Sequence, residues 1–280
     1  MAEIAEAHTP VAIDLPGHGK SSGAGFRGVA DYTHFVMELA SSFGWERYLV
    51  AGHSLGGAIA LATATYDHTH VSGMLLIDTG ARLRVNPEIL DAAREAAAQG
   101  QAIPLPRWSF AEKTTQSVID AVGRQIADTP PEVTLKDWIS DDSFDFLNRL
   151  GNITVPTLAI CGQEDQLTPV RYHEFFRDHL PNCQLEVVPD SGHWPYAEQP
   201  ELFDRAVRGF IDSLPNPCGA EGFKNHQAPP ETQVGQESTA SIRYGPLIES
   251  PVSRALLNCS AVSARIPSTP IPFAIATQSR

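Results

Sequence analysis

The sequence predicts an α/β fold: a mostly parallel sheet covered by helices, an inserted helical cap and a disordered C-terminal tail. Three observations lead to this prediction. Up to about Leu214, short apolar runs alternate with amphipathic stretches, the pattern of parallel strands joined by helices. Between about Arg82 and Leu150 the strand signal disappears. Beyond Leu214, Pro, Ser, Thr, Gln and Gly dominate without a regular apolar period, as in segments that do not build a packed core.

The expected strands are short apolar runs bounded by turn residues: 11–14, 47–51, 71–77, 157–161 and 185–188. The expected helices place apolar residues on one face at helical spacing: 31–43, 55–66, 172–179 and about 198–213.

The stretch between the third and fourth strands is too long for an ordinary crossover. Its segments 87–99 and 110–127 have a helical pattern, interrupted by the breakers Pro104, Pro106, Pro130 and Pro131. We therefore expect an incomplete core (1–81 and 151–214), a helical cap (82–150) and a flexible low-complexity tail (215–280). Within the tail, the apolar stretches 255–257 and 273–275 are the candidates for docking on the core.

Composition narrows the function classes. The 280 residues are 42% hydrophobic and 19% charged, with a formal net charge of −13, which argues against nucleic acid and anionic membranes as partners. The chain has no run of about 18 uncharged apolar residues that would predict a membrane span. Its four cysteines lack metal-ligand spacing, and its N-terminus lacks the features of a secretory signal. We expect a cytoplasmic protein that acts on a small molecule with no cofactor and no metal; the oligomeric state is left open.

The strongest chemical signal is Gly52-His53-Ser54-Leu55-Gly56-Gly57, which lies between an expected strand and an expected helix. In that context the G-x-S-x-G pattern indicates a nucleophile elbow. The turn is so sharp that small residues are needed at Gly52 and Gly56, and it lifts the Ser54 hydroxyl to a helix N-terminus, where developing negative charge is favoured.

A serine hydroxyl needs a base to take its proton and an acid to orient that base. Asp165 follows the fourth expected strand, and His193 lies in the loop after the last one. Parallel strands carry such loops to one rim, and the order Ser, Asp, His is the one expected for this elbow. Glu164 and Asp78 are the alternative acids, and we favour Asp165.

Together these motifs resemble the α/β-hydrolase fold superfamily, in its cap-bearing serine hydrolase group, over about Val11 to Leu214. The resemblance is carried by DLPGHGKS (14–21), GHSLGG (52–57), GQEDQLTP (162–169) and SGHWPYAEQPE (191–201). A serine at position 54 argues against the haloalkane dehalogenase and epoxide hydrolase branches, whose nucleophile is an aspartate.

The resemblance implies hydrolysis of a small ester, lactone or related carbonyl compound. Ser54 would attack the carbonyl, His193 would accept and return the proton, and Asp165 would orient the imidazole. The backbone N–H of Leu55 would stabilise the oxyanion. An acyltransferase is the sibling alternative, because only the second nucleophile differs.

The cap is expected to supply the substrate pocket. The candidate lining residues are aromatic: Trp108, Trp138 and Trp194, together with Phe110 and Phe146. Ordinary packing is the alternative role for each of them.

The sequence departs from the family at its start. The resemblance implies three strands and an oxyanion loop before DLPGHG, yet only ten residues precede Val11. One implied strand would lie between strands 11–14 and 47–51, so strand 11–14 is expected to shift, to pair with another segment or to stay unpaired. This makes a truncated family member that binds small molecules with little or no turnover a further alternative.

Overall fold

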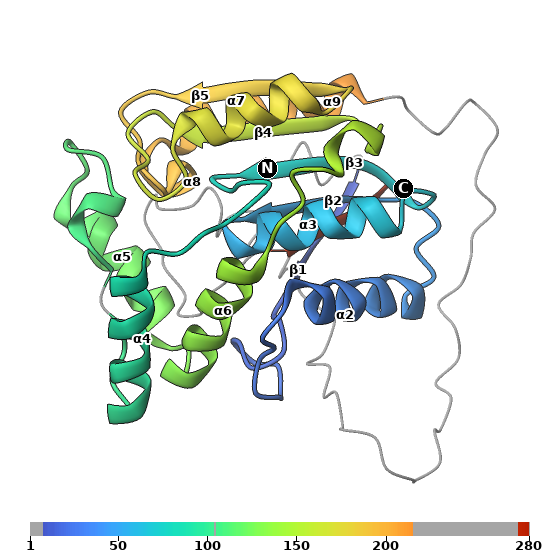
Figure 1. Cartoon of the computed structure of the whole chain (residues 1–280). Coiled ribbons are helices and arrows are strands. Elements are labelled where there is room, and N and C mark those ends of the chain that lie inside the picture. Colours follow the sequence, from blue (N-terminus) through green and yellow to red (C-terminus); the bar gives the residue numbers. More distant parts are fainter. Residues whose placement is uncertain (1–7, 104, 215–273, 280) are drawn as a thin grey trace, which may run out of the picture.

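The computed structural model describes residues 8–103, 105–214 and 274–279. Its centre is a six-stranded sheet (Figure 1). The order across the sheet is β1 (His8–Ile13), β6 (Ala274–Ser279), β2 (Tyr48–His53), β3 (Val71–Ile77), β4 (Thr157–Gly162) and β5 (Cys183–Val188). Strands β2 to β5 run parallel to one another, which confirms the predicted fold class.

The space between β1 and β2 is filled by β6, which is antiparallel to both. Ala276 pairs with Val11 on one side and with Val50 on the other. Of the three outcomes expected for the first strand, pairing with another segment is the one observed. Residues 274–279, assigned to the flexible tail from sequence, therefore form a strand; residues 215–273 and 280, including the stretch 255–257 and Phe273, lie outside the described residues.

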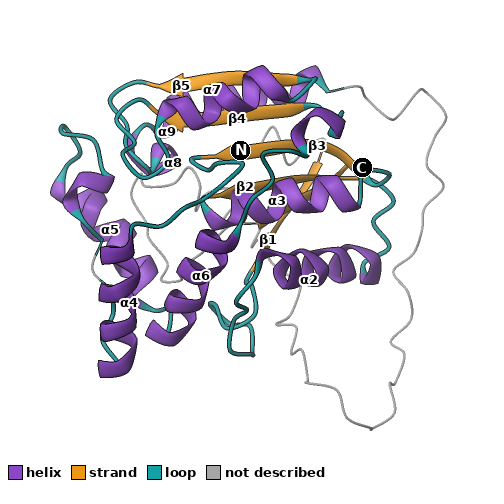
Figure 2. Cartoon of the chain, viewed as in Figure 1, coloured by secondary structure: helices purple, strands orange, loops and turns teal. Residues whose placement is uncertain are grey.

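Helices cover both faces of the sheet (Figure 2). On one face, α2 (Val29–Ser42), α3 (Leu55–Tyr66) and α7 (Val170–His179) enclose a core that includes Val50, Leu76 and Ala159. On the other, α9 (Pro200–Ser213) packs over the adjacent strand residues, such as Leu49 and Leu75. This alternation is the two-residue period of a strand buried on both sides.

The region between β3 and β4 forms a helical insertion, as expected: α4 (Pro87–Gln99), η1 (Arg107–Ser109), α5 (Gln116–Ala127), α6 (Pro131–Ser143) and η2 (Leu150–Asn152). Helix α6 was not predicted, because Pro130 and Pro131 were interpreted as breakers. Pro131 instead occupies the first turn, where the missing N–H has no helical partner to lose. Among the helices within the described ranges, none has both the length and the apolar character required to cross a membrane.

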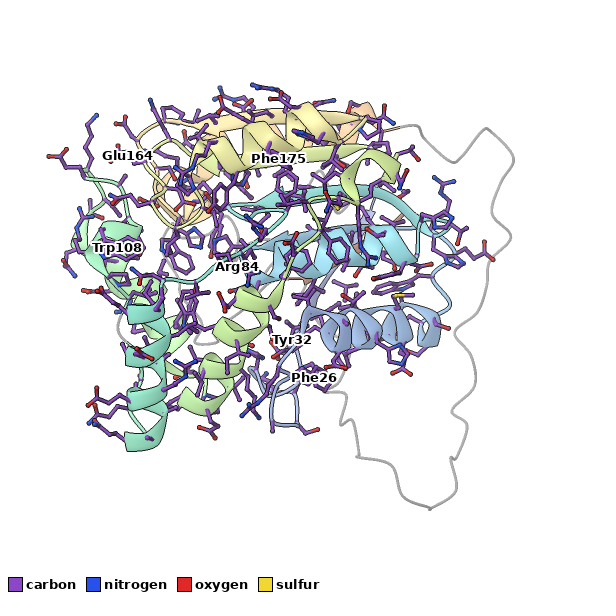
Figure 3. The ribbon with its side chains drawn as sticks, viewed as in Figure 1. Phe26, Tyr32, Arg84, Trp108, Glu164 and Phe175 are labelled. Carbon is purple, nitrogen blue, oxygen red and sulfur yellow. The ribbon has the colours of Figure 1, made fainter. Side chains whose placement is uncertain are left out.

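The insertion is attached to the core through Asp137 of α6. Its carboxylate accepts the hydroxyl of Tyr32 at 2.7 Å, and the ring of His18 lies 2.9 Å away at Nε2. The Tyr32 hydroxyl in turn accepts the Phe26 N–H; Figure 3 shows Tyr32 and Phe26 beside α6. The loop after β1, through His18, and α2, through Tyr32, thus hold α6 in position.

Candidate active site

Ser54 lies in a strained turn between β2 and α3. Its φ of 53° and ψ of −118° form a conformation that L-residues rarely adopt. The turn is held because the Ser54 N–H donates to the Ile77 carbonyl and the Ser54 carbonyl accepts from the Thr79 hydroxyl. A Cβ at Gly52 would lie 1.8 Å from the Gly56 carbonyl oxygen, so only glycine fits there. The strand-turn-helix context expected around Ser54 is therefore present.

Asp165 and His193 form a buried pair. Nδ1 of His193 lies 2.9 Å from Oδ2 of Asp165, and the two residues are 2% and 4% exposed. Asp165 also accepts the Thr168 hydroxyl and the backbone N–H groups of Leu167 and Thr168. Burial alone would raise the pKa of Asp165, but the charge of His193 and the side-chain hydrogen bonds from His193 and Thr168 outweigh it and hold the pKa well below the ordinary value. Asp165 is therefore a carboxylate throughout the neutral range.

His53, for which the sequence suggested no role, links the serine turn to the histidine loop. Its Nε2 donates to the His193 carbonyl oxygen at 2.7 Å, and the two ring centroids are 4.6 Å apart. Burial, followed by the neighbouring His193, lowers the pKa of His53 to about 3. The ring is thus neutral with its proton on Nε2. Its position directly before Ser54 is the only sequence signal that could have pointed to it.

Glu198, at the end of α8 (Pro195–Glu198), is a second residue that sequence reasoning missed. Its Oε1 accepts the backbone N–H groups of Gly192 and Trp194, and its Oε2 accepts the Ala111 N–H and the Thr114 hydroxyl. One carboxylate therefore joins both neighbours of His193 to the helical insertion. It belongs to the 191–201 motif, but its role depends on residues far away in the chain.

The three carboxylates considered from sequence occupy different places. Asp165 is in hydrogen-bond contact with His193. Glu164 instead accepts the Glu112 N–H and is half-buried, and Figure 3 labels it at the outer edge of the fold. Asp78 is fully buried behind the pair, with donor or acceptor atoms of Asp78, Asp165 and His193 all within 4.8 Å of one another. Such spacing would suit a cation, but the 2.9 Å approach of Nδ1 to Oδ2 assigns those two atoms to a hydrogen bond.

The aromatic candidates for the pocket separate into two groups. Trp194 is buried, meets the His193 ring edge-on at 5.3 Å and stacks on Phe110 at 5.9 Å. Trp108 is 41% exposed; the remaining two, Trp138 and Phe146, are half-buried on or after α6. The structure thus places Trp194 against the His193 ring and Phe110 against Trp194.

The serine, aspartate and histidine expected to react all follow strands that end at the same edge of the sheet. Ser54 follows β2, Asp165 follows β4 and His193 follows β5, and these strands all run in one direction. Carboxyl ends of parallel strands are where ligand sites form in open α/β sheets.

Comparison with known proteins identifies the family. The model of the "Alpha/beta hydrolase family" matches residues 1–206. A putative carbamate hydrolase RutD of Variovorax paradoxus is 27% identical over 75% of this chain and 84% of its own length. The 3-oxoadipate enol-lactonase 1 of Acinetobacter baylyi is 25% identical over 76% and 82%, respectively.

Among solved structures, an esterase from Thermogutta terrifontis superposes with a TM-score of 0.64 at 25% identity, covering 71% of this chain and 77% of the esterase. The match to the family model extends over more than half of the chain and includes the serine turn, Asp165 and His193. The chain therefore belongs to the alpha/beta hydrolase family and is a hydrolase.

Proposed function

We propose that this hydrolase cleaves a small ester, lactone or related carbonyl compound through Ser54, His193 and Asp165. The observation that carries the proposal is the buried Asp165–His193 pair, at the sheet edge where the strained turn presents Ser54. The names of similar proteins, an enol-lactonase, a carbamate hydrolase and an esterase, support carbonyl substrates of this class.

In the proposed reaction, Asp165 fixes the proton of His193 on Nδ1 and leaves Nε2 as the basic nitrogen. Nε2 accepts the Ser54 proton as the hydroxyl oxygen attacks the carbonyl carbon, and then donates it to the leaving group. Water, deprotonated by the same nitrogen, releases the acid from the acyl-enzyme. Asp165 stabilises the imidazolium formed in each half-reaction.

Leu55 is the first residue of α3, and its backbone N–H is the proposed donor to the oxyanion. The first N–H groups of a helix have no partner within the helix and lie at its positive end. Loss of one such donor typically costs about 3 kcal/mol of transition-state stabilisation.

We further propose that residues 82–150 act as a cap over residues 1–81 and 151–214. The hydrogen bond from the His193 N–H to the Ser109 carbonyl, and the stack of Phe110 on Trp194, support this role. Both bring the insertion directly against the histidine loop, where Trp194 and Phe110 would contact an apolar substrate group. Trp108 and Trp138 remain candidates for the outer part of that pocket.

Hydrolysis of p-nitrophenyl acetate by purified wild type, Ser54→Ala and Ser41→Ala tests the proposal. Ser41 is exposed near the end of α2, so Ser41→Ala is the matched control. We expect Ser54→Ala to lose about 10³-fold or more in kcat and Ser41→Ala to match wild type. Equal rates for wild type and Ser54→Ala would refute the proposal and favour a binding module; transfer of acetyl to an added alcohol would favour an acyltransferase.

A further inference from the structure

Asp78 occupies an unusual position behind the Asp165–His193 pair. It directly follows β3, is 0% exposed and has a φ of 40°, a left-handed conformation that few non-glycine residues adopt. Its Oδ1 accepts the Gly162 N–H at 2.9 Å. Its Oδ2 is buried and, among the residues that the structure describes, meets no N–H or O–H donor.

Another buried carboxylate, that of Asp165, lies close to Asp78. Atoms of Asp78 and Asp165 lie within 4.8 Å of each other, and two buried carboxyl groups this close do not both ionise. Asp165 carries the charge, because it accepts hydrogen bonds from His193, from the Thr168 hydroxyl and from two backbone N–H groups. Asp78 has one such bond and therefore holds the proton.

We propose that Asp78 is a positioning residue: a neutral carboxylic acid whose Oδ2–H donates to the Asp165 carboxylate and fixes it against His193. The Gly162 N–H holds the other oxygen of Asp78, so the donated hydrogen bond has a defined direction. This role rests on the proposed function, because it acts through the acid that orients the base.

The charge states of the surrounding titratable groups favour a protonated Asp78. Burial, then the charge of Asp165 and more weakly that of Glu198, raise the pKa of Asp78 well above its ordinary value. The Cys161 thiol on β4 also has a raised pKa, through burial first, and stays neutral. On α7, His173 accepts the Thr79 N–H, and burial lowers its pKa to about 4. Among the groups named here, His193 already pairs with Asp165 and the others are neutral or negatively charged. None of them supplies a positive charge that could balance an ionised Asp78.

The test compares Asp78→Asn with Asp78→Ala. The asparagine amide can donate to Asp165 while its oxygen accepts the Gly162 N–H, whereas alanine can do neither. We expect Asp78→Asn to keep kcat within about threefold of wild type, and Asp78→Ala to lose about tenfold in kcat with little change in KM, the effect of one hydrogen bond. Asp78→Asn should also retain activity on the alkaline side, where ionisation of Asp78 lowers the wild-type rate.

A spectroscopic measurement separates this inference from the proposed function. Carbon-13 NMR of aspartate-labelled wild type at pH 7 should show a protonated carboxyl signal that disappears in Asp78→Asn. The signal of Asp141, another buried carboxyl whose pKa is raised chiefly by burial, should persist and serves as the internal control. This readout needs no turnover, so it stands even if Ser54→Ala shows that the proposed function is wrong.

Three results would overturn the inference. An ionised Asp78 at pH 7 would remove the donor. A loss in Asp78→Asn as large as in Asp78→Ala would show that the charge, not the hydrogen bond, is needed. A full loss in Asp78→Asn with an active Asp165→Asn would make Asp78 the acid that orients His193.

Discussion

The His53 imidazole donates a hydrogen bond from Nε2 to the main-chain carbonyl oxygen of His193, 2.7 Å away. The residue before the proposed nucleophile is thereby tied to the backbone of the proposed base. Replacing His53 by alanine removes the bond and a ring that packs on His193. We expect His53→Ala to lower kcat about tenfold at nearly constant KM, as for one lost buried hydrogen bond.

Steady-state kinetics with His53→Gln and His34→Ala complete that test. The glutamine amide can still donate to the carbonyl, so His53→Gln should recover part of kcat. His34 lies exposed on α2, and His34→Ala should behave as wild type. A His53→Ala variant with wild-type kcat would show that the link does not position His193.

The carboxylate of Glu198 holds the His193 loop against the helical insertion through several hydrogen bonds. Glu198→Ala leaves the N–H groups of Gly192, Trp194 and Ala111 without their acceptor. We expect the free energy of unfolding to fall by about 3 kcal/mol or more, because three donors lose their acceptor and each buried unsatisfied donor costs about 1–3 kcal/mol. Urea unfolding measures this, with Glu46→Ala, an exposed position, as the control; equal midpoints would contradict the role.

Two buried neutral histidines make stability depend on pH. The pKa values of His53 and His173 fall to about 3 and about 4 in the folded state, from 6.5 in the unfolded chain. Below pH 6.5 the unfolded state therefore binds more protons, so the free energy of unfolding decreases as the pH falls toward 4. Each histidine contributes a slope of at most about 1.4 kcal/mol per pH unit.

Urea unfolding between pH 7 and pH 4 checks this prediction in wild type and in His173→Gln. Glutamine can still accept the Thr79 N–H through its oxygen but does not titrate in this range. The wild type should lose more stability on acidification than the variant does. If the free energy of unfolding fell equally with pH in the two proteins, His173 would not be neutral in the folded state.

Strand β6 should be necessary for the sheet. Without residues 274–279, β1 and β2 lose their shared partner, and each buried backbone group left unpaired costs about 1–3 kcal/mol. We expect deletion of 274–280 to lower the urea midpoint strongly, and deletion of Arg280 alone to leave it unchanged. An unaltered midpoint after the longer deletion would show that β6 does not stabilise the core.

Elements defined by local pattern were predicted well. The bounds of α3, α4 and β3 match the expected ranges because their apolar periods and flanking turns are contained within each segment. Strand β6 was not predicted, since its two partners lie more than 200 residues earlier and a short apolar run does not specify them. The contributions of His53 and Glu198 were missed for the same reason: each depends on a contact between distant segments.

Covalent capture measures whether His193 and Asp165 activate Ser54. Wild type, Ser54→Ala and His193→Ala are treated with a fluorophosphonate, and the adduct is located by peptide mass spectrometry. We expect one adduct, on Ser54, that is absent in Ser54→Ala and forms far more slowly in His193→Ala. No adduct on Ser54 in the folded wild type, or an equal rate in His193→Ala, would show that His193 does not activate Ser54.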